Sequence, residues 1–161
     1  MTLPTLPNSA APPRHLKAMA LDVGRARIGL AMTDDRCEIA MAFQVLERRG
    51  TRLDLQVLLP LVAQHQVEVW VVGLPPQLGD DEKSAHLAKG FAQALANAQR
   101  LPVWLVDEAD STAEAHQDLR LLGLRAARRR REVDKHAAKV ILDRWLAGAP
   151  ALAMAASSSE T

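Results

Sequence analysis

The stretch from Ala18 to Thr33, AMALDVGRARIGLAMT, constrains the fold more than any other part of the chain. It contains two short apolar runs joined by a glycine-containing turn, which is the pattern of a β-hairpin. One carboxylate, Asp22, stands inside the first run, where a strand normally buries apolar side chains. Burying a lone ionised carboxylate is unfavourable unless a partner compensates its charge. The stretch therefore predicts a hairpin in which Asp22 faces a metal ion, a basic side chain or local solvent.

The overall composition is that of a single ordinary domain. The chain has 161 residues, of which 48% are hydrophobic, so it can bury a sizeable core. No apolar run reaches the roughly 18 residues of a membrane span, and the proline-rich start lacks the apolar segment of a signal peptide. We expect a cytoplasmic protein with a disordered N-terminal tail over residues 1–15, one domain over 16–148 and a disordered C-terminal tail over 149–161.

Hydrophobic periodicity gives an α/β fold class. Helices are expected from Thr51 onward, over 82–98, from the capping box at Ser111 to about Gly123, and over 132–147, with a basic loop at 124–131. Strands are expected over 16–23, 27–33, 39–46, 67–74 and 102–106. This order predicts a mixed five-stranded sheet flanked by helices, with three antiparallel strands followed by two parallel ones.

Acidic residues stand at three unusual places in this pattern. Asp22 lies within a strand, Asp107 and Glu108 follow the strand 102–106, and Asp134 lies in the first turn of the last predicted helix, on its apolar face. Active groups in such sheets gather beyond the carboxyl ends of the parallel strands. Carboxylates that converge repel one another unless a cation lies between them, and oxygen ligands suit Mg²⁺ or Mn²⁺. We therefore predict a metal site of the kind that cleaves phosphodiesters with two ions. Asp107 is a further candidate ligand of this site.

Each acid also has a purely structural interpretation. Asp134 fits the N-terminus of a helix through its favourable interaction with the helix dipole. Asp107 and Glu108 fit a solvated strand end that leads into a helix cap. Spacing along the chain does not decide between these interpretations and a shared site.

Four motifs resemble those of the YqgF/RuvX family, the pre-16S rRNA nucleases related to Holliday junction resolvases. They are LDVGRARIGLAMTD, VVGLP, VDE followed by STAEA, and VDKHAA, and the similarity covers about residues 16–147. The resemblance implies an RNase H-like fold and metal-dependent hydrolysis of nucleic-acid phosphodiesters. It also implies that Asp22, Glu108 and Asp134 are the catalytic, metal-binding acids.

The chain departs from the family pattern beside two of these motifs. Ala109 follows Glu108 where the family usually has arginine, and Ala26 stands where the turn usually has lysine. Arg25 is placed to replace that lysine as a phosphate contact.

Nucleic-acid binding is predicted from local charge, because the net charge is only +1. The predicted phosphate contacts are arginines beside Asp22 or shortly before Asp134: Arg25, Arg27, Arg125, Arg128, Arg129, Arg130 and Arg131. Such contacts give affinity without sequence readout. The alternatives are a solvated basic loop and, for Arg27, a structural ion pair with an acid.

The favoured hypothesis is a metal-dependent nuclease that uses Mg²⁺ or Mn²⁺ and acts in 16S rRNA precursor processing. RNA, free or within pre-ribosomal particles, is the expected partner, and the chain is expected to be a monomer or a homodimer. A Holliday junction resolvase acting on branched DNA and a non-catalytic RNA-binding ribosome assembly factor stay open. In the sugar-kinase and actin-like ATPase fold the phosphate-binding hairpin also begins with Asp-x-Gly, but those proteins need a second, similar domain for which this chain has no room.

Overall fold

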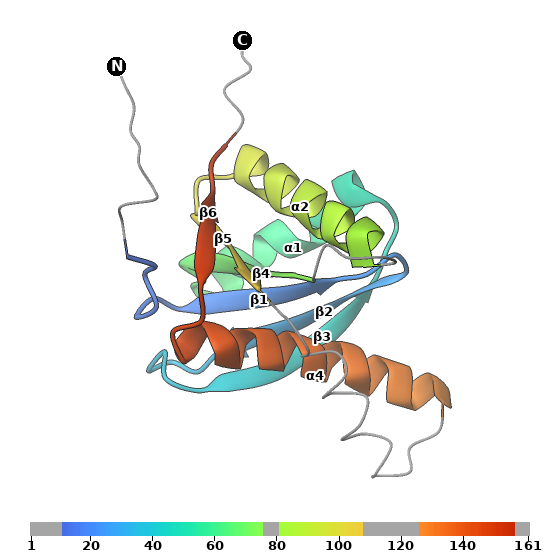
Figure 1. Ribbon diagram of the computed structural model, residues 1–161, viewed down its shortest axis with the longest axis horizontal. Coiled ribbons are helices and arrows are strands. Elements are labelled where there is room, and N and C mark those ends of the chain that lie inside the picture. The colour runs from blue at the N-terminus through green and yellow to red at the C-terminus, as the bar shows by residue number, and fades with distance from the viewer. Residues whose placement is uncertain (1–10, 76–80, 108–125, 157–161) are drawn as a thin grey trace.

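The computed structural model describes residues 11–75, 81–107 and 126–156, and within it the chain forms an α/β fold (Figure 1). In chain order the elements are β1 (Ala18–Val23), β2 (Arg27–Thr33), β3 (Ala40–Glu47), α1 (Thr51–His65), β4 (Val69–Leu74), α2 (Asp81–Ala98), β5 (Val103–Asp107), α4 (Ala126–Leu146) and β6 (Ala151–Met154). Across these described residues, no helix combines the length and apolar character needed to cross a membrane.

The strands form one mixed sheet in the order β3-β2-β1-β4-β5-β6. The pairs β2–β3 and β1–β2 are antiparallel, whereas β1, β4 and β5 run parallel to one another. Helix α4 covers one face of the sheet, and α1 and α2 lie on the other (Figure 1). The predicted order of a meander followed by parallel strands is confirmed.

Alternation along the strands divides the core into two layers. In β1, Met19 and Leu21 pack in the layer beneath α1 and α2, while Ala18 and Ala20 pack in the layer beneath α4. Small alanines on the α4 side let that helix approach the sheet, and Trp145 of α4 is fully buried there. Because successive side chains of a strand point to opposite faces, Asp22 belongs to the α4 face.

Among the described residues the sheet has six strands, so the prediction of five is wrong by one. The added strand is β6, whose residues 151–154 lie inside the segment predicted to be a C-terminal tail, and it pairs antiparallel with β5. Four residues with partly exposed side chains carry too little periodicity to identify a strand. The strand forms because the edge of β5 supplies backbone hydrogen-bond partners.

Residues 11–15, predicted to belong to an N-terminal tail, also contact the domain. The guanidinium group of Arg14 donates to the carbonyl oxygens of Trp145 and Ala149, and it lies 4.9 Å from the centre of the Trp145 ring. These contacts join the segment before β1 to the end of α4. The sequence around Arg14 gives no indication of these contacts.

The last helix begins earlier than predicted. Helix α4 starts at Ala126, so residues 126–131, expected to be a basic loop, have helical backbone. Alanine and arginine are both good helix formers, and the run of four arginines therefore continues the helix rather than ending it. The predicted helix from Ser111 to Gly123 and the loop at 76–80 lie outside the described residues.

Candidate active site

Asp22 lies near the carboxyl end of β1, directly opposite Gly29 of β2 in the antiparallel register. Residues paired in this way share a face of the sheet, so both lie beneath α4. The side chain of Asp22 is partly buried. Since β1, β4 and β5 are parallel, their carboxyl ends meet at the same edge of the sheet, and Asp22 lies there as predicted.

At Gly29 the backbone of α4 comes into direct contact with the sheet. A β carbon at Gly29 would overlap the main-chain carbonyl group of Asp134. The helix backbone therefore rests on the glycine itself, which no residue with a side chain would permit. Through this contact the structure brings Asp134 to the part of the α4 face that carries Asp22.

Asp134 lies eight residues after Ala126, the first residue of α4, and not in the first turn as predicted. The helix-dipole explanation for this acid is therefore wrong, because that effect is confined to the terminal turns. Its helix neighbours Ala137, Ala138 and Ile141 are fully buried against the sheet. The prediction that Asp134 shares the apolar face of the helix is confirmed.

Arg27 pairs with Asp134. Its Nε donates to Oδ2 of the carboxylate at 2.6 Å, with 27% of the Arg27 side chain and 22% of the Asp134 side chain exposed. This hydrogen bond raises the pKa of Arg27 above its ordinary value, so the guanidinium stays charged throughout the physiological range. The alternative interpretation of Arg27, an ion pair with an acid, is confirmed. The pair fixes one carboxylate oxygen of Asp134.

The remaining predicted acids differ in placement. Asp107 ends β5, where Val103 and Leu105 face α1 and α2, and alternation puts Asp107 on that side of the sheet. The structure therefore does not bring Asp107 together with Asp22 and Asp134. Instead, the main-chain carbonyl of Asp107 accepts a hydrogen bond from Nε of Arg144 at 2.8 Å. Glu108 lies outside the described residues.

The chemistry of the donor set fits a hard divalent cation. Asp22 and Asp134 offer carboxylate oxygens from one face of the sheet, and oxygen ligands are those that Mg²⁺ and Mn²⁺ prefer. Within residues 11–75, 81–107 and 126–156, no three histidine, cysteine or acidic side chains form a group that would hold a metal. Glu108, the third acid that the family resemblance implies, lies outside the described residues, so its part in the site stays a prediction.

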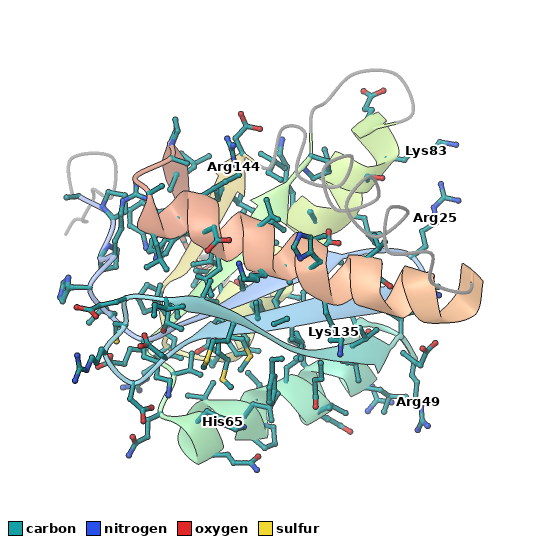
Figure 2. The ribbon with its side chains drawn as sticks, turned by 90° about the horizontal axis from the view of Figure 1, so that it is seen from below. Arg25, Arg49, His65, Lys83, Lys135 and Arg144 are labelled. Carbon is teal, nitrogen blue, oxygen red and sulfur yellow. The ribbon has the colours of Figure 1, made fainter. Side chains whose placement is uncertain are left out.

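Basic side chains lie at the end of the molecule that carries the β1–β2 turn. Figure 2 shows Arg25, Arg49 and Lys83 there, coming from three different segments. Arg25 is exposed, as expected of a phosphate contact. Arg125 lies outside the described residues, and for Arg128, Arg129, Arg130 and Arg131 only the helical backbone is described. Their role in binding stays a prediction.

Two features of the site region were missed from the sequence. Gly29 is a glycine inside a strand, which by itself indicates a close approach of another backbone. Arg48 and Asp54 form a buried ion pair beside the β1–β2 turn. No signal in the sequence marks that pair, because a surface pair six residues apart looks the same.

Comparison with known proteins identifies the family of the chain. The family model RuvX, described as Holliday junction resolvase, matches residues 16–148. A relative from Anaeromyxobacter sp. (strain Fw109-5), named "Putative pre-16S rRNA nuclease", is 42% identical over 134 residues, which cover 83% of this chain and 98% of the relative. A relative of the same name from Maridesulfovibrio salexigens is 35% identical over 135 residues, covering 83% of this chain and all of the relative.

A solved structure, T. thermophilus RuvC in complex with a Holliday junction substrate, has a similar fold. It aligns with a TM-score of 0.55 at 16% sequence identity, over 86% of this chain and 100% of that one. At this identity the likeness shows the RNase H-like fold alone, which confirms the predicted fold class. Given the family match over most of its length and the relatives above 30% identity, the chain belongs to the RuvX family.

Proposed function

We propose that this protein is a metal-dependent nuclease that hydrolyses phosphodiester bonds of nucleic acid, with precursor 16S rRNA as the favoured substrate. The observation that carries the proposal is the placement of Asp22 and Asp134 on one face of the sheet, joined through Gly29. The alignments cover 98% and 100% of two relatives that are named for pre-16S rRNA. Those names support rRNA over other substrates.

Asp22, Asp134 and Glu108 would hold Mg²⁺ or Mn²⁺. When bound, such ions supply an activated water and stabilise charge on the departing 3′ oxygen. The chain's own groups position the acids and the substrate. Arg27 fixes the Asp134 carboxylate through Oδ2, and the exposed Arg25 is placed to contact a phosphate beside Asp22. Because such contacts are not base-specific, substrate choice would depend on the shape of the nucleic acid.

A second candidate is the resolution of branched DNA, which the description of the family model favours. It uses the same acids and the same hydrolysis, so the two candidates differ in substrate and not in chemistry. Cleavage of a four-way DNA junction in preference to precursor rRNA would select it.

The test compares wild-type protein, Asp22→Asn and Asp143→Asn on precursor 16S rRNA and on a four-way DNA junction, with Mn²⁺ or Mg²⁺. Asp143 lies on the exposed side of α4, paired with Lys139 at 2.9 Å, and so controls for loss of one acid from the same protein. We expect Asp22→Asn to lose about 100-fold or more of the cleavage rate with unchanged circular dichroism, and Asp143→Asn to keep it. Full activity in Asp22→Asn, or full activity of wild type in EDTA, would refute the proposal.

A further inference from the structure

Arg48, the first residue after β3, has a nearly buried guanidinium group that contacts three partners. Its Nε donates to Oδ2 of Asp54 at 2.9 Å and its Nη1 to the carbonyl oxygen of Gly24 at 3.2 Å. Its Nη2 donates to Oγ1 of Thr51, also at 3.2 Å. Only 9% of the Arg48 side chain and 1% of the Asp54 side chain are exposed. The group therefore joins the β1–β2 turn to the start of α1.

Further contacts hold Arg48 in this orientation. Oδ1 of Asp54 accepts the main-chain N–H of Arg49 at 2.9 Å, so both carboxylate oxygens are bonded. The Arg48 guanidinium lies 5.2 Å from the centre of the Phe91 ring of α2. A guanidinium presents its donors in a rigid planar fork, so fixing one partner fixes the direction of the others.

The turn to which Arg48 is hydrogen-bonded lies between Asp22 and Arg27. Arg27 is the residue that pairs with Asp134. Gly24 donates its N–H to the carbonyl of Arg27 at 2.9 Å, and the N–H of Arg48 donates to the carbonyl of Ala26 at the same distance. With the Nη1 bond to Gly24, Arg48 therefore binds the turn at two carbonyl groups. Any displacement of the turn would move Asp22 and Arg27 with it.

Stability alone does not account for this arrangement. A buried ion pair is commonly no more stabilising than apolar residues of similar volume, because both charges lose their hydration. What an apolar pair would not provide is a donor aimed at the Gly24 carbonyl. The distinctive consequence of the Arg48–Asp54 pair is thus the fixed position of the turn.

We propose that Arg48, oriented by Asp54, is a positioning residue for the nuclease reaction, which it serves by holding the β1–β2 turn and so the relative placement of Asp22 and the Arg27–Asp134 pair. This inference rests on the proposed nuclease function. The guanidinium group of Arg48 donates to three protein partners, so we assign it no part in the chemical step.

The experiment uses Arg48→Lys, Asp54→Asn and the double variant in the full-length chain. Lysine keeps the charge but offers no fork that spans Asp54 and Gly24. Arg36→Ala is the control, because Arg36 is an exposed arginine beyond the opposite end of β2. Amide hydrogen exchange at Gly24 reports the turn without any metal or substrate, and an amide of β4 such as Val71 reports the whole fold. Single-turnover and steady-state cleavage give kcat and KM.

In Arg48→Lys we expect protection of the Gly24 amide from exchange to fall about tenfold, because the turn loses one hydrogen bond to a charged group. The Val71 amide should keep its protection. We expect kcat to fall about tenfold or more with KM changed by less than about threefold, since no substrate contact is removed. Asp54→Asn should act in the same direction and keeps the test open if the lysine variant does not fold. The double variant should be no slower than the worse single variant, because the two residues act as one unit.

The outcomes separate the two proposals. If wild type cleaves and Arg48→Lys leaves Gly24 protection unchanged, or loosens the turn without lowering kcat, the positioning role is refuted and the nuclease function stands. If wild type cleaves no nucleic acid, the proposed function is refuted and the positioning role with it. A tenfold rise in KM at constant kcat would show a substrate contact and would also refute the role.

Discussion

The main-chain carbonyl group of Asp134 lies against Gly29, so closely that a β carbon on that glycine would overlap it. This contact sets how closely α4 packs on the sheet. It places Asp134 beside Gly29, which is the residue paired with Asp22 across the two strands. The glycine in β2 is therefore part of the site even though it has no side chain.

Replacing Gly29 by alanine should force α4 away from the sheet. We expect a loss of about 2 kcal/mol in the free energy of unfolding and a Tm lower by about 4–8 °C, the usual range for overpacking a rigid contact. Cleavage should fall further than the folded fraction does, because Asp134 moves relative to Asp22. Thermal denaturation and an assay at low temperature measure both.

Gly90→Ala is the matched control. Gly90 lies on the exposed side of α2, and an added β carbon would meet nothing within 4 Å. Alanine there should stabilise the helix by up to about 1 kcal/mol. If the two alanine variants have equal Tm values, the close packing of α4 on Gly29 is wrong.

Removing the charge of Arg27 should release the Asp134 carboxylate. Both side chains are about a quarter exposed, so solvent screens the pair and Arg27→Gln should cost only about 1 kcal/mol of stability. Activity should fall by about tenfold or more, because Asp134 loses its fixed orientation. Urea denaturation and cleavage kinetics measure the two effects.

Lys139→Gln breaks an exposed ion pair within the same helix, Lys139 with Asp143 at 2.9 Å, and serves as the comparison for Arg27→Gln. It should change stability by less than about 0.5 kcal/mol and leave cleavage unchanged. An Arg27→Gln variant as active as this control would show that the Arg27–Asp134 pair is structural only.

Asp34 should make the protein sensitive to acid. The N–H groups of Glu38 and Ile39 donate to its Oδ1 at 2.8 and 3.0 Å, and these bonds lower the pKa of the carboxyl below its usual 3.8. A carboxyl whose pKa is lower in the folded state stabilises the fold above the unfolded pKa, and that contribution is lost as the pH falls through the folded pKa. The stability difference between wild type and Asp34→Asn should thus be constant near neutrality and shrink below about pH 4.

Urea denaturation at several pH values and an NMR titration of the Asp34 carboxyl test this expectation. A folded-state pKa at or above 3.8 would contradict it.

Arg14→Gln should weaken the attachment of the N-terminal segment to α4. It removes two hydrogen bonds to the carbonyls of Trp145 and Ala149 and the contact with the Trp145 ring. We expect a loss of about 1–2 kcal/mol, seen as a lower urea midpoint. The exposed neighbour His15, replaced by alanine, should change stability by less than about 0.5 kcal/mol. Equal midpoints for the two variants would mean that residues 11–15 do not contribute to the domain.

Local pattern was sufficient to predict most of the elements. The hairpin around Gly24, the β-branched apolar strand 69–74 and the amphipathic helix 81–98 have local patterns typical of their elements, and each is predicted to within two residues. The same pattern identified Asp22 as a charge within an apolar strand and Asp134 as an acid on an apolar helix face. These predictions rest on interactions between near neighbours in the chain, which the sequence displays directly.

Only the tertiary structure decided the contacts between distant segments. That β6 joins the sheet depends on the free edge of β5, and the hydrogen bonds of Arg14 depend on the end of α4. The start of α4 at Ala126 removed the helix-dipole explanation of Asp134, and strand alternation separated Asp107 from the other acids. The sequence by itself determined which residues carry charge in apolar surroundings. Which of those residues come to the same region of the sheet was decided by the backbone contact at Gly29, because packing joins residues whose separation along the chain says nothing of their distance.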